Sequence, residues 1–240
     1  MVRFGVNFDF RNPQQWHRPW DKVYKSTLER IAYAEELGYD GVWLTEHHFV
    51  DDGYSPSPLT LAAAVAMHTK KVLIGTSVLL LPLYNAIRLA EDAATVDILS
   101  GGRLVLGIGQ GYRTVEFDSL NVPKSERLER FKEGIEILKR AWTEPEVHFQ
   151  GKHYSLNGIS VTPKPIQKPR PQIWIGANTE SATRRAARLA DGFVGANKPH
   201  LIELYTQTVK ELRGPDAPLN ISRSVVLYVS EDPEEDWYHL

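Results

Sequence analysis

Short β-rich runs alternate with helical runs along almost the whole chain. The β-rich runs lie at residues 2–8, 42–44, 72–81, 103–108, 172–175, 192–196 and 221–229, and the helical runs at 20–37, 57–68, 85–99, 125–142, 181–189 and 201–212. The helical periodicity is clearest at 125–142, where apolar side chains recur every three or four residues. Strands that alternate with helices indicate a parallel sheet covered by helices, so we expect an α/β fold.

The even alternation of these elements favours a TIM-type (β/α)8 barrel over an open, doubly wound sheet. The expected strands stop at seven, and residues 231–240 look like the start of another helix, so the barrel lacks its final strand. One segment breaks the rhythm: Val147 to Val161, with turns at Gln150-Gly151 and Asn157-Gly158, predicts a β-hairpin insertion. We therefore expect a single barrel domain over residues 1–240, either shortened or incomplete at its C-terminus.

Composition excludes several classes of protein. The chain has no cysteine, which rules out disulfides, thiolate metal sites and cysteine nucleophiles. Its net charge of −2 gives no broad attraction to nucleic acid or to an acidic membrane surface. The longest apolar run, at residues 72–83, is shorter than the roughly 20 residues that span a bilayer, and the N-terminus lacks the apolar core of a signal peptide. We expect a soluble, cytoplasmic protein.

In a barrel of this type the site lies at the C-terminal ends of the strands, where Glu46, His47 and His48 follow the strand at 42–44. Two adjacent histidines on a strand point to opposite faces, and no second carboxylate stands at metal-ligand spacing, so no metal site is expected. The three side chains are either satisfied polar groups at a buried strand end or a site of proton transfer. In the second case one histidine acts as general base or proton donor, tuned by an adjacent carboxylate.

Two further strand ends carry small residues. Gly107 to Tyr112 is glycine-rich, but its third glycine comes one residue too early for a dinucleotide fingerprint, so it is either a tight turn or a surface for a flat ligand. Gly176 to Ser181 combines a small-residue turn with a hydroxyl-bearing helix start, which suits either a phosphate or ordinary N-capping by Thr179 or Asn178. Arg127 could neutralise the same anion or lie on a solvated helix face.

Together these motifs resemble the bacterial luciferase-like flavin monooxygenases, in order and over nearly the whole chain. The matching residues are Val42 to Phe49, Ile74 to Val78 with Leu81-Pro82, Arg88 with Ala90 to Asp92, Leu99 to Arg103, Gly107 to Gly111, Glu126-Arg127, Ile173 to Thr179, and Ala190 to Gly192. The resemblance implies a TIM barrel with insertions, often paired as a dimer, that binds reduced flavin mononucleotide (FMN) or the deazaflavin F420.

The resemblance also implies roles for single residues. His47 matches the histidine needed for flavin oxygen chemistry, and Glu46 matches a residue beside the flavin. Ser77 and Val78 match a pair that is joined by a non-prolyl cis peptide and packed against the ring. The remaining cofactor-binding positions that we expect are Thr76, Gly109, Gln110, Tyr112, Arg127, Ala177, Asn178 and Thr179. Bacterial luciferase has an arginine where Gln110 stands, which weakens charge neutralisation of the phosphate here.

The function implied by the resemblance is that of a flavin-dependent monooxygenase. Reduced FMN from a separate flavin reductase would react with O₂ to give a C4a-peroxyflavin, which oxygenates a small, mostly apolar substrate in a homodimeric enzyme. His47 would manage the peroxide proton, and Glu46 would assist it. The alternatives are an F420-dependent hydride-transfer oxidoreductase, a non-catalytic flavin-binding protein and, more remotely, a metal-dependent hydrolase.

Overall fold

The computed structural model describes the chain except residues 1, 196, 228, 233 and 235–240. Its main sheet contains β1 (Gly5–Phe8), β2 (Gly41–Leu44), β3 (Leu73–Thr76), β4 (Leu79–Leu80), β5 (Leu104–Gly109), β8 (Gln172–Ala177), β9 (Gly192–Gly195) and β10 (Ile221–Arg223). The helices are α1 (Trp20–Glu36), α2 (Pro58–His68), α3 (Ala86–Leu99), α4 (Thr114–Ser119), α5 (Arg127–Thr143), α6 (Glu180–Leu189) and α7 (Pro199–Arg213). Three single turns of 3-10 helix are η1 (Gln14–Trp16), η2 (Leu81–Leu83) and η3 (Lys124–Glu126).

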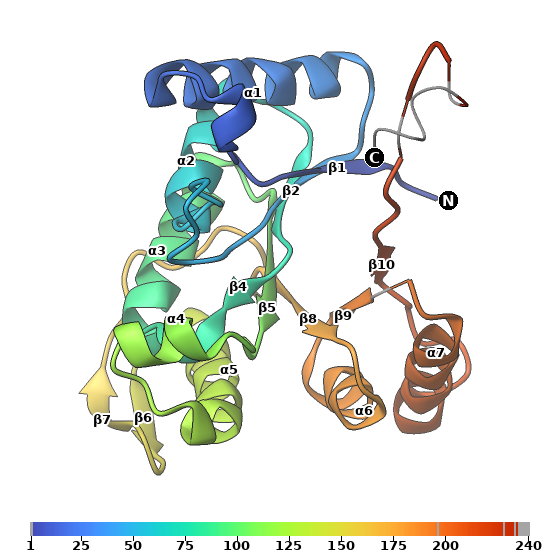
Figure 1. Ribbon diagram of the computed structural model, residues 1–240. Coiled ribbons are helices and arrows are strands. Elements are labelled where there is room, and N and C mark those ends of the chain that lie inside the picture. Colours follow the sequence, from blue (N-terminus) through green and yellow to red (C-terminus); the bar gives the residue numbers. More distant parts are fainter. Residues whose placement is uncertain (1, 196, 228, 233, 235–240) are drawn as a thin grey trace.

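The sheet is parallel and curled, with its helices on the outside (Figure 1). Its strands follow the order β1-β2-β3-β5-β8-β9-β10, and the short β4 pairs with β5. The path therefore holds the seven strands that the sequence predicts, arranged as in a TIM-type barrel. Within the described part of the chain, β1 and β10 are the two edges of this sheet.

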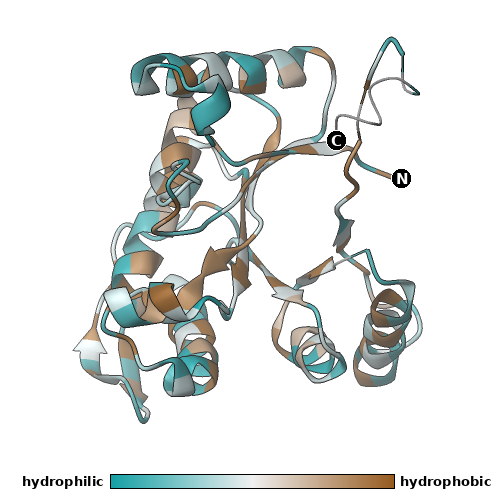
Figure 2. Ribbon diagram, in the orientation of Figure 1, coloured by the Kyte–Doolittle hydropathy of each residue, from teal (hydrophilic) through white to brown (hydrophobic). Residues whose placement is uncertain are grey.

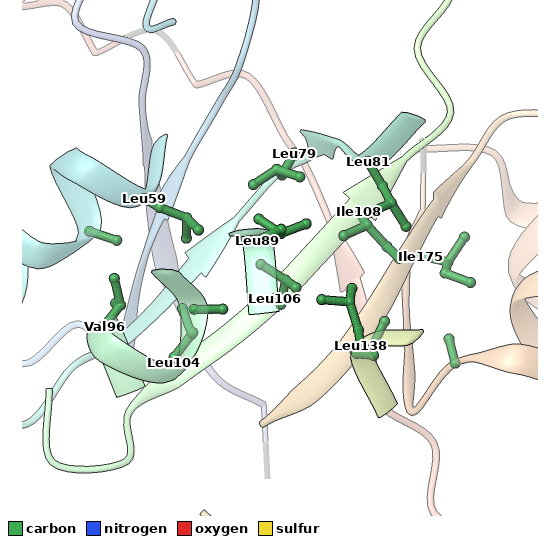
Figure 3. Close-up of a cluster of buried hydrophobic side chains, with 14 of the residues drawn as sticks. Leu59, Leu79, Leu81, Leu89, Val96, Leu104, Leu106, Ile108, Leu138 and Ile175 are labelled. Atoms are coloured by element: carbon green, nitrogen blue, oxygen red, sulfur yellow. The ribbon is translucent and has the colours of Figure 1, made fainter. Parts of the chain in front are cut away.

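The core lies between the sheet and the helices that cover it. All six residues of β5 are buried, and their apolar side chains meet those of α3, α5 and the neighbouring strands (Figure 3). Hydrophobic residues follow the strands, whereas the helices carry hydrophilic residues on their outer sides (Figure 2). No helix in the described ranges is long and apolar enough to cross a bilayer.

Helix α5 confirms the strongest periodic prediction. Phe131, Ile135, Leu138 and Trp142 are all buried, and the Trp142 indole donates to the carbonyl of Ala90 on α3 at 2.9 Å. The apolar stripe thus packs α5 against α3 and the sheet, as its spacing of three and four residues indicates.

Two expected strands are shorter than predicted. The run at 72–81 divides into β3 and β4, and the break contains a cis peptide between Ser77 and Val78, as the family resemblance implies. The run at 221–229 forms a strand only up to Arg223, which pairs with Gly195 at the end of β9. Pairing stops there because β9 ends, and the following residues 225–227 are exposed. Residues 196 and 228 of the predicted strands, and most of the predicted helix at 231–240, lie outside the described residues.

The hairpin insertion forms, with one of its two predicted turns: Gln150-Gly151 lies where β6 (Val147–Gln150) ends and the connecting loop begins, but Asn157-Gly158 is not a turn between strands. Strands β6 and β7 (Ser155–Ile159) pair antiparallel and are joined by residues 151–154, whereas Asn157-Gly158 lies inside β7 beside a register shift. The carboxylate of Glu133 on α5 accepts the backbone N–H groups of the three consecutive residues 152–154. This long-range contact, which local turn propensity does not reveal, places the turn.

Candidate active site

The loops after β1 and β2 are joined to each other at the C-terminal edge of the sheet. The backbone N–H of His47 donates to the carbonyl of Ser55 at 3.1 Å, and the N–H of Ser55 donates to the carbonyl of Asp9 at 2.9 Å. The N–H of Asn12 donates to the carbonyl of Asp52 at 2.8 Å. These bonds hold the residues that follow β2 in one conformation at the strand ends.

The His47 imidazole is held by a carboxylate that lies far away in the sequence. Its Nδ1 lies 2.8 Å from Oε1 of Glu116, whose side chain on α4 is fully buried. The same oxygen accepts the backbone N–H of His48 at 3.1 Å and a guanidinium N–H of Arg113 at 3.3 Å. Arg113 also donates to the carbonyl of His48 at 2.8 Å. Nδ1 of His47 is therefore engaged in a hydrogen bond with a buried carboxylate.

Two tyrosines flank His47 on its outer side. The rings of Tyr54 and Tyr112 lie edge-on to the imidazole, with centroids at 4.9 and 5.7 Å. The Tyr112 hydroxyl lies 3.5 Å from Nε2 of His47. Arg11 stands over the Tyr54 ring at 5.5 Å and donates to the Asp52 carboxylate at 2.6 Å. Nε2 of His47 therefore faces an aromatic, partly exposed surface, where a ligand can reach it.

Glu46, the carboxylate next to His47 in sequence, belongs to a different cluster. Its fully buried side chain accepts hydrogen bonds from Nε2 of His48 at 2.7 Å, the hydroxyl of Tyr84 at 2.8 Å and the backbone N–H of Leu80 at 2.8 Å. The bond to Glu46 outweighs burial and raises the pKa of His48 above its ordinary 6.5. Burial and the charge of Glu46 raise the pKa of Tyr84 well above its usual range. Of the two histidines, His48 is the one that Glu46 contacts, and no hydrogen bond among the described residues joins Glu46 to His47.

The two histidines face different spaces. His48 borders a cavity of about 280 Å³ on the outer side of the strand ends, between the loop after β2, α2, α3 and the end of α4. Its lining residues are His48, Pro56, Ser57, Leu59, Thr60, Leu83, Tyr84, Asp92 and Leu120. His47 does not line this cavity and faces Tyr112 instead.

Val78 forms an apolar platform at the ends of β5 and β8. A Cβ atom on Gly109 would lie 2.6 Å from one methyl group of Val78, and a Cβ on Gly176 would lie 2.9 Å from the other. The two glycines thus let the half-buried Val78 side chain settle against bare backbone on both strands. Ser77, which precedes Val78 across the cis peptide, is half-buried at the same edge.

Thr76 and Glu46 are two predicted site residues whose polar side chains are enclosed. Thr76 is fully buried, and its hydroxyl donates to the carbonyl of Gly107 at 2.6 Å, which ties β3 to β5. Glu46 is equally shielded from solvent. Both side chains hold neighbouring elements in place and do not present a polar atom to a ligand.

The turn after β8 has the geometry of an open helix N-terminus. Ala177 ends the strand, Asn178 is exposed, and Thr179 caps α6 by accepting the N–H of Ala182 at 3.4 Å. The Thr179 and Ser181 hydroxyls lie 3.4 Å apart. Capping by Thr179 is thus present, and the first N–H groups of the helix remain directed outward, as they do at any helix start.

Two predicted phosphate contacts lie on other elements. Arg127 begins α5 and donates to the carbonyl of Lys124 at 3.2 Å, and no hydrogen bond within the described ranges joins it to Thr179. Gln110 is half-buried in the loop between β5 and α4. A cation that sequence reasoning missed, Lys198, lies beside the turn after β8, with its Nζ 3.5 Å from the carbonyl of Asn178.

Sequence reasoning also missed Glu116, the residue that holds His47. Helix α4 has six residues, too few for a periodic pattern, and no side chain caps its start. The sequence therefore carries no local signal that singles out Glu116. Among the described residues, no three His, Cys, Asp or Glu side chains are grouped so that they could hold a metal ion.

A family model and a solved structure point to the same protein family. The family model described as luciferase-like monooxygenase matches residues 2–240. The structure is similar to that of monooxygenase RslO1 from Streptomyces bottropensis, with a TM-score of 0.90 and 28% identity over 99% of this chain and 75% of that one. This similarity confirms the predicted TIM-type barrel fold.

Curated relatives fall into two kinds. An F420-dependent glucose-6-phosphate dehydrogenase from Microbacterium testaceum is 36% identical over 186 residues, which are 75% of this chain and 54% of the relative. The oxygenase component of a flavin-dependent trigonelline monooxygenase from Acinetobacter baylyi is 31% identical over 159 residues, or 65% of this chain and 44% of the relative. The chain thus spans about half the length of the curated relatives that it matches.

Proposed function

The chain belongs to the luciferase-like monooxygenase family, and on that premise we propose that it is an oxidoreductase that uses reduced FMN and O₂ to oxygenate a small, mostly apolar substrate. The observation that carries the proposal is the placement of His47. Its Nδ1 is held by buried Glu116, and its Nε2 is directed toward Tyr112 at the strand ends. A histidine with one nitrogen anchored and the other accessible is suited to donate or accept a single proton.

The residues at the strand ends fit a flat ring with a phosphate tail. Val78, settled between Gly109 and Gly176, would support one face of the ring. The first N–H groups of α6 and the hydroxyls of Thr179 and Ser181 would bind the phosphate. When bound, reduced FMN would supply the electrons that activate O₂.

Few cationic side chains would neutralise the phosphate besides the helix N-terminus. Arg127 at the start of α5 and Lys198, whose Nζ lies 3.5 Å from the carbonyl of Asn178, are the cations that we expect to approach the anion, together with the backbone of Ala177 and Asn178. Gln110 contributes no charge at the position where it stands. Binding would therefore depend mainly on the helix start and less on paired cations.

The chain itself would handle the proton and exclude water. His47 would give or take the proton at Nε2, where Tyr112 is the nearest polar neighbour. Tyr54 and Tyr112 would form apolar walls around a small substrate, and the Arg11–Asp52 pair would close the side of the Tyr54 ring that faces away from His47. A water-poor site protects reactive oxygen chemistry from side reactions.

The proposal includes two partners. A separate flavin reductase would deliver reduced FMN, and the enzyme would work as a homodimer. F420-dependent hydride transfer is the second candidate, supported by the 36% identity to an F420-dependent glucose-6-phosphate dehydrogenase.

The test compares cofactors directly. Fluorescence titration with FMN and with F420 establishes which one binds, and an oxygen electrode measures O₂ consumption with reduced FMN and candidate apolar substrates. We expect tighter binding of FMN and substrate-dependent O₂ uptake that falls at least about tenfold, roughly 1.4 kcal/mol, in His47→Ala. The matched control His200→Ala alters an exposed histidine on α7 and should leave both quantities unchanged. Preferential F420 binding without O₂ uptake would support hydride transfer, and tight FMN retention without turnover would indicate a flavin-binding protein.

A further inference from the structure

We propose that Glu116 is the positioning residue for His47, and that it fixes the imidazole with its proton on Nδ1 and with Nε2 free. The proposed function gives His47 its chemical task, and this inference rests on it in that respect. The arrangement of the two side chains is a property of the protein without any ligand, so it can be tested separately.

The donors around Glu116 determine the direction of its bond to His47. Oε1 of Glu116 accepts from the backbone N–H of His48 and from the guanidinium of Arg113, and neither of these groups can accept a hydrogen bond. The carboxylate oxygen is therefore an acceptor, and Nδ1 of His47, at 2.8 Å, must be the donor. In a neutral imidazole a protonated Nδ1 leaves Nε2 with a lone pair. The bond made by one ring nitrogen thus sets the state of the other.

Burial makes Glu116 a rigid anchor. Its side chain is fully buried, and within the described part of the chain its second oxygen, Oε2, has no hydrogen-bond partner. The next residue, Phe117, is also fully buried and packs against the backbone at Gly111. A side chain enclosed in this way has few alternative rotamers, so it can hold the His47 ring at one angle.

The arrangement is specific, because a second carboxylate is nearer in sequence and serves the other histidine. Glu46 bonds to Nε2 of His48, to Tyr84 and to β4, and it makes no hydrogen bond to His47 among the described contacts. Arg113 supports the separation, since it donates both to Glu116 and to the carbonyl of His48. Each histidine therefore has its own buried acid, which predicts that the two acids can be disabled one at a time.

The experiment reads the tautomer of each histidine in the ligand-free protein. Protein labelled with ¹⁵N-histidine is measured by long-range ¹H–¹⁵N NMR at about pH 8.5, where an ordinary imidazole is neutral. A His47→Gln spectrum assigns the His47 signals. We expect wild-type His47 to carry its proton on Nδ1, and this population to be lost or mixed with the Nε2–H tautomer in Glu116→Leu, which removes the acceptor oxygen. In that variant the His48 signals should keep their wild-type pattern.

The matched control is Glu46→Gln, which should alter the His48 signals and leave the His47 tautomer unchanged. A wild-type His47 protonated on Nε2 would overturn the proposal without any variant. An unchanged Nδ1–H tautomer in folded Glu116→Leu would also overturn it. If Glu116→Leu does not fold, the wild-type tautomer and the Glu46→Gln spectrum still decide. The two proposals fail separately. If the Nδ1–H tautomer of His47 is lost in Glu116→Leu while His47→Ala keeps full O₂ uptake, only the proposed function is contradicted.

Discussion

The carboxylate of Glu46 accepts a 2.7 Å hydrogen bond from Nε2 of His48 and bypasses His47, which stands between them in sequence. The segment after β2 therefore sends adjacent histidines to opposite sides. His48 is built into a buried network with Tyr84, whereas His47 is left to face the strand ends. This division predicts a contribution to stability from His48, and it leaves His47 placed for the proton transfer that we propose; the two can be tested independently.

His48 should make stability depend on pH. Because its pKa is raised in the folded protein, its contribution is fully present below the unfolded value of 6.5 and is lost as pH rises through the folded value. We expect the free energy of unfolding of wild type to exceed that of His48→Gln most at about pH 5.5, and the difference to shrink toward about pH 9. Urea unfolding at a series of pH values measures it. The same series for His200→Gln, at an exposed site, is the control for replacing a histidine. A difference between wild type and His48→Gln that does not change with pH would refute the linkage.

Glu35 should also make stability depend on pH, but its contribution should be lost in acid instead of in base. Burial alone would raise its pKa, but the backbone N–H groups of Val72, Lys71 and Lys70 outweigh burial, and the pKa lies below its ordinary 4.5. Its contribution is therefore present above pH 4.5 and is lost as pH falls through the folded value. Glu35→Gln should cost about 1–3 kcal/mol at neutral pH and progressively less in acid.

Chemical unfolding of the Glu35→Gln variant between about pH 7 and pH 3 measures this trend. Glu36→Gln, at the exposed neighbouring position, serves as the control and should stay within about 0.5 kcal/mol of wild type. A Glu35→Gln cost that does not change with pH would contradict the prediction.

Arg103 should not tolerate replacement by lysine. Its guanidinium donates to five oxygens at the C-terminal end of α2 and in the flanking turns: Ser100 O, Thr69 Oγ1, Val72 O, Ala66 O and Thr69 O. An ammonium group cannot reproduce this planar fork. We expect Arg103→Lys to lower the free energy of unfolding by about 2 kcal/mol or more. Arg88→Lys changes an exposed ion-pairing arginine on α3 and should cost less than about 1 kcal/mol. Equal losses in the two variants would show that the fork has no special role.

Gly109 should be required for the platform that we assign to the flavin ring. A Cβ at this position would stand 2.6 Å from Val78, so Gly109→Ala must displace that side chain, and overpacking of this kind costs roughly 1–3 kcal/mol. We expect FMN affinity to fall, measured by fluorescence titration, with a lowered thermal midpoint. At Gly41 a Cβ would meet Leu73 at an ordinary 3.5 Å, so Gly41→Ala should keep wild-type affinity. Wild-type affinity in Gly109→Ala would remove Val78 from the proposed site.

The alternation of elements and the spacing of apolar residues were sufficient to predict the parallel sheet, its seven-strand path and the α5 face. Such patterns are local: Phe131, Ile135 and Leu138 recur at the helical period, so their common face follows from the backbone geometry. The cis peptide at Ser77–Val78 followed from the family resemblance. A local signal failed at Asn157-Gly158, which has the residues of a turn but lies inside β7 beside a register shift, because pairing with β6 decides its conformation.

The sequence by itself determined that Glu46, His47 and His48 stand at a strand end, because an apolar strand and its neighbours dictate where the chain leaves the sheet. Only the tertiary structure decided which acid serves which histidine. Glu116 is 69 positions from His47 and sits on a helix too short to leave a periodic signal. The pairing depends on where α4 docks beside the loop after β2, and docking is set by long-range packing of residues such as Phe117, which no local pattern encodes.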